Sequence, residues 1–426
     1  MKTISIISRV LLGLIFIFSG YVKAVDPIGS ELIFISYFEA FNMEFLNPLA
    51  LHIGILLSVA ELVLGFCLLM GLRMKLTAWA TAAFMAFFTV LTFILAIFNP
   101  VSDCGCFGEA IKMTNWETFY KNLALDVFVV IVFLQRNNYR PLSNCRNEII
   151  TGSAFAVFMV LLSVYCLRHL PLIDFLPYKV GVNIQQAMEI PEGAKTDVYE
   201  TTLIYEKDGK QQSFTLENYP KDDSWRFVDS KSVLKEKGDM PPIVDFSIIS
   251  RDWAYITDSI LNLQGYLFII TLTHVEKASL SHINKINAIY DYVLDHECMH
   301  FIGLSGSDEG HVMQFIEQTN ARYPIHITDE KPLKSMVRSN PGLMLLHNGT
   351  IIAKWSHVDV PSIKKLEKKY LSKNPDKLIV KHQTAENFAS PLLAVVLFVI
   401  MIMLSYCFRK YGNKKKGDAD SPTLSA

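Results

Sequence analysis

The chain has 426 residues, of which 51% are hydrophobic and 19% are charged, and its formal net charge at pH 7 is −1. A mean hydropathy of +0.28 is too apolar for an ordinary soluble protein, so membrane-spanning helices are expected. The small net charge gives no argument for nucleic-acid binding, and seven cysteines are too few for a disulfide-rich scaffold of this length.

Long apolar runs crowd the N-terminal third of the chain and recur once near its end. Each run is near the ~20 residues that a helix needs to cross a bilayer. The first run resembles a signal peptide, but no small-residue cleavage site is convincing and further spans follow at once, so we expect it to be retained. The predicted spans cover residues 4–24, 49–72, 76–98, 118–135, 148–168 and 390–408.

Lys and Arg gather on one side of these spans. They cluster before span one, between spans two and three, between spans four and five, and after the last span. By the positive-inside rule these clusters are cytoplasmic. The loops at 25–48 and 99–117 and the large segment at 170–389 then lie outside, and six spans place both termini in the cytoplasm.

The outer loop at 99–117 contains Cys104 and Cys106, separated by a single glycine. A disulfide between them closes a small ring, which favours easy reduction and hence an oxidant or electron relay. Asp103 would raise the pKa of a neighbouring thiol, whereas a helix N-terminus at about Thr114 would lower it. A second interpretation, a static disulfide that only shapes the loop, also stays open. Metal binding is disfavoured, because two thiolates alone make a poor metal site.

Three ionisable residues lie within the predicted spans. Glu61 is near the middle of span two, Asp126 lies in span four, and Lys23 closes span one on the outer side. A charge at such depth is costly and must face the helix bundle or a partner. Two interpretations stay open: a proton-transfer or quinone site, or a buried polar tie between neighbouring helices.

Short motifs in the first two spans are Gly13–Phe16, Ser19–Lys23, Asp26–Pro27, Ala60–Gly65 and Leu69–Gly71. They resemble the DoxX superfamily, and the Cys-Gly-Cys loop is similar to its MauE (methylamine utilisation) branch. The resemblance covers about residues 4–137. It implies a four-helix module in the bacterial inner membrane that is linked to periplasmic redox chemistry, since MauE-like proteins are associated with disulfide formation in a periplasmic partner. Nothing else points to methylamine.

The next segments are expected to be a cytoplasmic linker with the fifth span at 138–168, and a small β-rich external segment at 169–240. In the latter, Val198–Tyr205 and Gln212–Leu216 alternate as strands do, and Asp208-Gly209 between them is typical of a hairpin turn. We find no catalytic constellation in this segment.

Residues 241–375 alternate between predicted strands and helices. The expected strands are 267–272, 299–304, 343–346 and 351–355, the last two joined at Asn348-Gly349; the expected helices are 279–294, 307–319 and 361–372. This order resembles a thioredoxin fold. Asn340, Pro341 and Gly342 stand at the place of that family's cis-proline, and the resemblance implies that they hold a partner protein.

This domain departs from the thioredoxin family at the active site. Residues 273–281 stand where the Cys-x-x-Cys should lie, and they contain no cysteine. Thiolate exchange needs a thiol at the helix N-terminus, so we expect a binding module rather than an exchanging one. The remaining cysteines are expected to behave as small buried hydrophobes. They are Cys67, Cys145, Cys166, Cys298 and Cys407.

Residues 296–300 read His-Glu-Cys-Met-His, which matches the zinc metalloprotease pattern. That chemistry needs both histidines on one face of a helix. Here the motif straddles a predicted helix end and strand start, and positions four apart in a strand lie roughly 13 Å apart. We therefore predict no metal site.

The expected fold is multi-domain: an α-helical four-helix membrane bundle (1–137), two further spans, and an external α/β thioredoxin-like domain. A linker (376–389), the sixth span (390–408) and a basic tail (409–426) complete the chain, and the tail's lysines can contact anionic membrane lipid. Two function classes follow. In the first, Cys104 and Cys106 exchange disulfides or electrons with a periplasmic protein, aided by intramembrane charges or a quinone. The second is a non-catalytic membrane-anchored binding scaffold with a structural disulfide.

Overall fold

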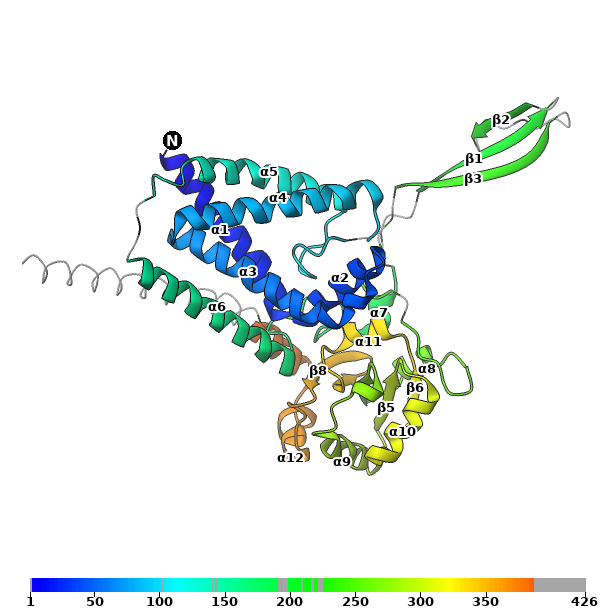
Figure 1. Cartoon of the computed structure of the whole chain (residues 1–426). Helices are drawn as coiled ribbons and strands as arrows, with labels where there is room; N and C mark the ends of the chain where they lie inside the picture. Colours follow the sequence, from blue (N-terminus) through cyan, green and yellow to red (C-terminus); the bar gives the residue numbers. More distant parts are fainter. Residues whose placement is uncertain are drawn as a thin grey trace, which may run out of the picture.

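The computed structural model describes residues 2–386, apart from 102, 140, 142–143, 191–192, 194–197, 208–209, 216–217, 219, 221–224, 237, 239 and 245. The predicted sixth span, the basic tail and Cys407 lie outside the described residues. The described chain forms a helical N-terminal domain, a projecting β-sheet and an α/β C-terminal domain (Figure 1).

Four of the described helical segments are long and apolar enough to cross a membrane, which makes this a membrane protein by length and composition. They are Thr3–Val25, Glu44–Met70, Met74–Phe98 and Cys145–Arg168. They agree with predicted spans one, two, three and five. The corresponding helices are α1 (Lys2–Val25), α3 (Ala50–Met70), α4 (Met74–Phe98) and α6 (Cys145–Arg168).

The fourth predicted span forms helix α5 (Asn115–Leu134), which carries three charged residues and is not among these four. It nevertheless runs the length of the bundle beside α4 (Figure 1). Ring contacts between Trp79 and Phe133 (4.6 Å between centroids) and between Phe93 and Phe119 (5.2 Å) give the two helices an antiparallel register. The helix begins where expected, because Thr114 and Glu117 form a capping box.

The segment at 25–48, which we predicted as an outer loop, is largely helical. Helix α2 (Pro27–Ala40) begins after Asp26, whose carboxylate accepts a hydrogen bond from the Gly29 backbone at 2.9 Å. Proline at the first helical position suits this start. A short 3-10 helix, η1 (Glu44–Leu49), then leads into α3. We predicted a loop here from the low content of Lys and Arg. That content indicates the side of the membrane and carries no information on helix formation.

Helices α1 and α3 pack closely because glycine occupies their contact positions. A Cβ added to Gly20 would lie 2.8 Å from the Ser58 carbonyl oxygen, and one added to Gly65 would lie 2.8 Å from the Ile17 backbone nitrogen. Small residues let helix backbones approach one another in membrane proteins. This approach brings polar side chains of the two helices into direct contact.

The two ends of the bundle differ in composition. Arg73, Lys75 and Arg136 surround one pocket at the end that also holds the N-terminus. Helix α2, the Cys-Gly-Cys loop and the C-terminal domain lie at the opposite end (Figure 1). The basic residues assigned to the cytoplasm and the loops assigned to the outside are therefore at opposite ends of the helices.

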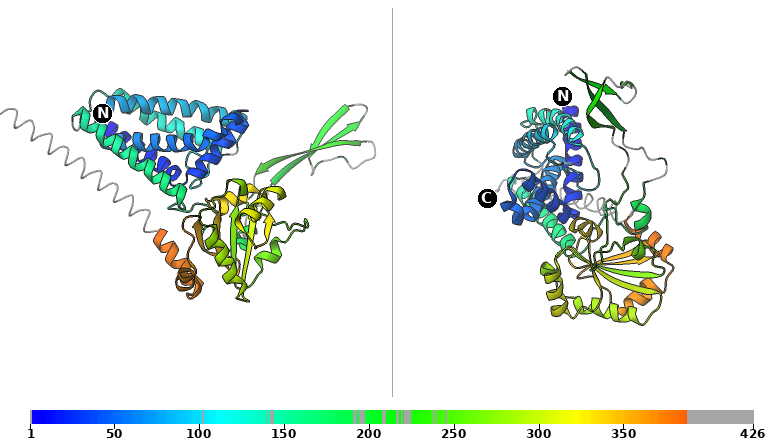
Figure 2. Two further views of the ribbon diagram at one scale, coloured as in Figure 1. Left: turned by 60° about the horizontal axis from the view of Figure 1, so that its bottom comes forward. Right: turned by 90° about the vertical axis from the view of Figure 1, so that its right-hand side faces the viewer.

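A three-stranded antiparallel sheet projects away from both domains in every view (Figures 1 and 2). Its order is β2-β1-β3, formed by β1 (Val198–Lys207), β2 (Lys210–Thr215) and β3 (Arg226–Glu236). The first two strands confirm the predicted hairpin strands, although the turn at Asp208-Gly209 lies outside the described residues. Strand β3 was not predicted.

The C-terminal domain is built on a five-stranded sheet in the order β6-β5-β4-β7-β8. The first three strands are parallel, and β7 and β8 are antiparallel to their neighbours. The predicted strands and the Asn348-Gly349 turn are confirmed, whereas β6 was missed. The strands are β4 (Tyr266–Leu272), β5 (Met299–Ser305), β6 (Ile325–Ile327), β7 (Gly342–His347) and β8 (Thr350–Ser356).

Two hydrophobic cores cover the two faces of this sheet. On one face, Phe268 and Ile270 pack with residues of α9 and α10; on the other, Leu267 and Ile269 pack with α11 and with residues 178–184. That last segment belongs to the stretch that we assigned to the β-rich external segment. The helices are α7 (Ile184–Met188), α8 (Thr257–Leu261), η2 (Val275–Lys277), α9 (Ile283–Leu294), α10 (Glu309–Thr319) and α11 (Glu330–Met336).

The last predicted helix, at 361–372, is divided between α12 (Ile363–Leu366) and a π-helical turn, η3 (Glu367–Leu371). Residues 375–386 are also helical, where a linker was expected at 376–389. Leu378 is buried in the core formed with α9 and α10. A buried apolar residue in this stretch explains why it folds onto the domain.

Candidate active site

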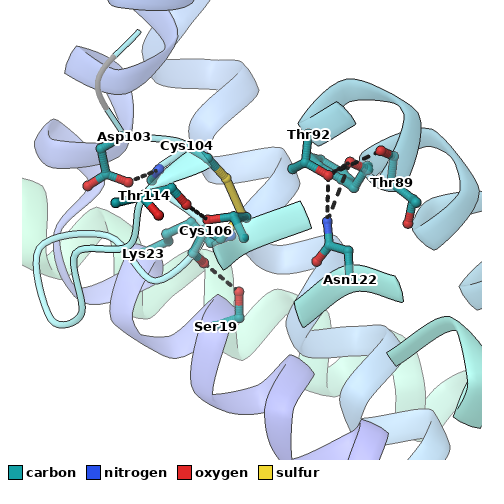
Figure 3. The surroundings of a disulfide bond; sticks show 12 residues. Ser19, Lys23, Thr89, Thr92, Asp103, Cys104, Cys106, Thr114 and Asn122 are labelled. Carbon is teal, nitrogen blue, oxygen red and sulfur yellow. Dashed lines mark hydrogen bonds between the residues drawn. A yellow bond between two sulfur atoms is a disulfide. The ribbon is translucent and has the colours of Figure 1, made fainter. Parts of the chain in front are cut away.

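Cys104 and Cys106 form a disulfide on the loop between α4 and α5 (Figure 3). Gly105 between them has φ +65°, in the left-handed region that glycine adopts without strain. A Cβ at this position would also collide with the Ile33 side chain on α2. Glycine is therefore required both for the turn and for the close approach of α2 to the disulfide.

Hydrogen bonds from two helices fix the cysteine backbone. The Ser19 hydroxyl on α1 donates to the Cys106 carbonyl at 2.7 Å, and the Tyr37 hydroxyl on α2 donates to the Cys104 carbonyl at 2.8 Å. Burial raises the pKa of Tyr37, with the Asp103 charge adding to the effect, so its hydroxyl stays protonated and can donate. The Asp103 carboxylate accepts a loop backbone hydrogen bond at 2.8 Å.

A buried ion pair lies directly below this loop. The Lys23 Nζ is 2.6 Å from a Glu61 carboxylate oxygen, and the two side chains are only 8% and 7% exposed. The second Glu61 oxygen is 3.0 Å from the Ser19 hydroxyl, which also contacts the Cys106 carbonyl. A hydroxyl has one proton to donate. Ser19 therefore donates to the carboxylate or to the Cys106 carbonyl at any moment, and it links Glu61 to the disulfide loop.

Asp126 is not part of this arrangement. Its carboxylate accepts a hydrogen bond from the Thr89 hydroxyl at 2.8 Å, and it ties α5 to α4. It does not line the cavity beside the disulfide. Of the three intramembrane charges that we predicted as candidates, the fold brings together Lys23 and Glu61 and leaves Asp126 as a polar tie between helices.

A cavity of about 550 Å³ adjoins the disulfide. Cys104, Gly105 and Cys106 form part of its wall, and most of the rest is aromatic or aliphatic. Six polar residues besides Tyr37 also line it: Ser19, Lys23, Ser30, Glu61, Lys121 and Asn122. The disulfide thus faces an apolar chamber with a few polar groups rather than bulk water.

Lys121 and Asn122 were missed in the sequence. The Lys121 Nζ lies 4.4 Å from the centre of the Phe107 ring, and the buried Asn122 amide donates to the Thr92 hydroxyl at 3.1 Å (Figure 3). Both are spaced three or four residues from the buried Leu125 and so share the inward face of α5. This helical spacing could have predicted from the sequence that both polar residues face the bundle.

The predicted partner-binding residues lie in a well-packed loop. The Asn340–Pro341 bond is cis, and Pro341 and Gly342 are buried. The Asn340 side-chain amide donates to the His274 carbonyl at 2.7 Å, and the Asn340 backbone carbonyl accepts from the Ser279 backbone N–H at 3.0 Å. The cysteine-free stretch 273–281 therefore lies beside the cis-proline.

The same loop contacts the membrane domain. The Arg338 guanidinium lies 2.9 and 3.2 Å from one Asp26 carboxylate oxygen. Their side chains are 2% and 13% exposed, so this ion pair is largely removed from solvent. Asp26 also caps α2, which lies next to α11 (Figures 1 and 2). The cis-proline end of the C-terminal domain therefore rests against the helix that covers the disulfide.

The zinc-like motif lies between α9, which ends at Leu294, and β5, which begins at Met299. It is not on a helix, in agreement with our prediction for its placement. Within the described parts of the chain, no group of three or more His, Cys, Asp or Glu side chains could hold a metal ion.

The cysteines outside the loop differ in exposure. Cys166 is buried and Cys67 is half-buried, as expected of small hydrophobes, but Cys145 and Cys298 are exposed. The expectation of burial was wrong for these two because each lies at the edge of its element. Cys145 is the first residue of α6, and Cys298 directly precedes β5.

Residues 1–135 match the family model of methylamine utilisation protein MauE, and residues 199–237 match a domain of unknown function, DUF8463. No curated protein matches the chain. The first match covers α1 to α5 and every residue that lines the cavity, and the second covers most of the projecting sheet. The N-terminal third of the chain is therefore similar to MauE, and the protein carries a MauE-like membrane module with several apolar helices.

Proposed function

We propose that this protein is a thiol–disulfide oxidoreductase of the bacterial inner membrane, in which Cys104 and Cys106 exchange disulfides with a periplasmic protein. The observation that carries the proposal is the position of the disulfide. It forms the wall of a cavity and is linked through Ser19 to the buried Lys23–Glu61 pair. A purely structural loop needs neither the cavity nor a buried ion pair beneath it.

The exchange follows ordinary thiol chemistry. A partner thiolate attacks one sulfur of the loop disulfide, a mixed disulfide forms, and the other loop sulfur leaves as a thiolate. A second partner thiolate then resolves the mixed disulfide, so the partner is oxidised and the loop becomes a dithiol. Lys23 and Glu61 line the same cavity as the two cysteines, and we propose that they supply the proton that the leaving thiolate takes up. The same steps in reverse reduce a partner disulfide.

The proposed topology places the loop and the C-terminal domain in the periplasm. It is supported by the basic residues Arg73, Lys75 and Arg136, which gather at the other end of the helices. It requires α5 to cross the membrane despite its charges. Each charge of α5 has a local role: Glu117 caps the helix, Lys121 lines the cavity, and Asp126 accepts a hydrogen bond from α4.

We infer a thioredoxin-like fold for the C-terminal domain. Support comes from the strand order β5-β4-β7-β8, with two parallel strands followed by an antiparallel hairpin, and from the cis bond at Pro341. Because residues 273–281 hold no thiol, the domain contributes binding rather than exchange. Its cis-proline end, where the half-buried Asn340 lies beside the partly exposed stretch 276–281, is the surface proposed to hold the partner near α2.

Trapping in intact cells tests the proposal. Cys106→Ala removes the resolving thiol, so Cys104 should accumulate as a mixed disulfide with the periplasmic protein after acid quenching and alkylation. A non-reducing gel and mass spectrometry identify the adduct. Cys298→Ala is the matched control, because it removes an exposed thiol away from the loop and should trap nothing.

The second candidate function is a membrane-anchored binding scaffold with a static disulfide. It is favoured by the packing of the cysteine-free domain against α2 through Arg338. It predicts a single, fixed oxidation state for Cys104 and Cys106 in the wild type. A free Cys104 thiol in Cys106→Ala, with no adduct, would decide for the scaffold.

A further inference from the structure

We infer that the cavity beside the disulfide binds a lipid-soluble quinone, which accepts the electrons that Cys104 and Cys106 collect. The inference rests on the proposed exchange function, because an oxidant that has become a dithiol must be reoxidised before it can act again. It adds to that function the chemical class of the electron acceptor and the residues that hold it.

The size and lining of the cavity suit this class of ligand. A volume of about 550 Å³ lies within the roughly 300–1,000 Å³ of typical small-molecule sites. Phenylalanine side chains from α2, from the residue that follows it and from α4 line the cavity, and they suit a flat ring. They are Phe34, Phe38, Phe41, Phe84, Phe87 and Phe88.

The rim of the cavity indicates entry from the lipid. Phe87, on the apolar helix α4, lines the cavity and is also 63% exposed. In a membrane, exposed aromatic side chains on spanning helices contact lipid tails. A ligand entering there must be lipid-soluble. A nucleotide cofactor would have to carry its phosphate charges across an apolar wall without partners, at high cost.

The polar groups used in this argument come from three helices, α1, α3 and α5. Lys121 offers N–H donors from α5, while Ser19, Lys23 and Glu61 lie on α1 and α3. A quinone ring has two carbonyl oxygens at opposite ends and needs a donor near each. Lys121 makes no ion pair within the described residues, and its ammonium group lies over the Phe107 ring, next to Cys106. This places an uncompensated cation where negative charge develops on a quinone oxygen or on a thiolate.

The proposed step balances in atoms and electrons. Two S–H bonds of the Cys104–Cys106 dithiol break and one S–S bond forms, which releases two electrons and two protons. The quinone takes up both, and two O–H bonds form to give the quinol. Glu61 and Lys23 line the same cavity as the two cysteines and are proposed to carry the protons, and no further oxidant is needed at this step.

The test uses the full-length protein in lipid nanodiscs. The loop is reduced, the reductant is removed without air, and decylubiquinone is added. We expect stoichiometric quinol formation, read by ultraviolet absorbance, together with loss of free thiols at Cys104 and Cys106. Leu91→Trp fills the cavity and should abolish quinone binding, measured by equilibrium dialysis. Leu123→Trp adds the same side chain at a lipid-facing position of α5 and should bind quinone as the wild type does.

Lys121 provides a second test. Lys121→Met should slow quinone reduction by about 100-fold, as loss of one charge-stabilising donor does at other sites, while Lys121→Arg should recover much of the rate. Lys112→Met is the control, since Lys112 lies on the neighbouring loop with 72% of its side chain exposed. Equal rates in Lys121→Met and wild type would remove Lys121 from the proposal.

The outcomes separate the two proposals. If wild type and Leu91→Trp bind quinone equally, or if native mass spectrometry finds only phospholipid in the cavity, the quinone site is overturned. The exchange function then stands or falls on the Cys106→Ala adduct alone. An adduct without quinone binding keeps the exchange and requires a different oxidant. If neither the mixed-disulfide adduct nor quinol formation is detected, both proposals fail and the binding scaffold is the remaining function.

Discussion

Two places in this molecule have the layout of a thiol-exchange site, and only one holds thiols. In the membrane domain, a short loop carries Cys104 and Cys106 over a cavity and a buried ion pair. In the C-terminal domain, residues 273–281 lie beside a cis-proline but contain no cysteine. Under the proposed function, the membrane domain supplies the thiols and the C-terminal domain supplies the binding surface.

The largest expected effect comes from breaking the ion pair beneath the reactive loop. Glu61→Gln or Lys23→Met leaves one buried group without its partner, and removing one member of a buried pair destabilises by about 3–5 kcal/mol. Replacing both, as Lys23→Met with Glu61→Leu, should restore much of the stability. Chemical unfolding of the N-terminal helices in detergent measures both changes.

The double variant also sharpens the comparison between structure and chemistry. If the pair only ties α1 to α3, the restored protein should exchange disulfides at the wild-type rate. If Glu61 moves protons, the double variant should remain slow in disulfide exchange although its stability is restored. Glu109→Gln is the control, since its partner Lys112 is exposed and such surface pairs contribute about 1 kcal/mol or less.

Much of each domain was readable from the sequence because local signals were strong. The apolar runs predicted α1, α3, α4 and α6, and the Asn348-Gly349 turn predicted the β7–β8 hairpin. Helix α2 was missed because its hydrophobic residues show no helical periodicity. Strand β6 has only three residues, too few for a two-residue alternation to be recognised.

The candidate site was predicted only in part. The sequence identifies individual candidates, because each is a charge or a thiol next to apolar residues: Lys23, Glu61, Cys104 and Cys106. Their contact depends on the glycine-mediated approach of α1 to α3, which is a tertiary event. The contact between Arg338 and the membrane domain joins residues 312 positions apart, and no local pattern marks it.

That contact gives the second prediction, of smaller size. Arg338→Gln should cost about 2 kcal/mol, at the low end for truncating one member of a buried, hydrogen-bonded charge pair. It should also release the C-terminal domain from α2, because Asp26 loses its partner and stays as the cap of α2 alone. Limited proteolysis of the 169–182 connection and thermal unfolding measure the two effects.

A charge swap checks the cause. Asp26→Arg combined with Arg338→Asp should recover part of the lost stability, whereas either change alone should lower it. Arg322→Gln serves as the control, because Arg322 pairs with Asp291 at an exposed position of the same domain. If Arg338→Gln unfolds like Arg322→Gln, the two domains are held together by other contacts.

The smallest expected effect concerns the reactivity of the loop thiols once they are reduced. Burial raises the pKa of Asp103, and a hydrogen bond from the Gly105 backbone opposes this. When ionised, its carboxylate disfavours a thiolate next to it. Asp103→Asn keeps a hydrogen-bond acceptor and removes the charge. It should speed alkylation of the reduced loop by about threefold at pH 7, equivalent to roughly half a pKa unit of the thiol.

The sign of the pH dependence follows from the same shift. A carboxyl whose pKa is raised becomes neutral at a higher pH than an exposed aspartate does. As pH falls through that pKa, the wild type therefore loses the charge that the variant lacks from the start. The difference in alkylation rate between wild type and Asp103→Asn should be present at neutral pH and shrink on acidification. A difference that is constant with pH would mean that the substitution acts through loop geometry and that the Asp103 charge has no part in tuning the thiols.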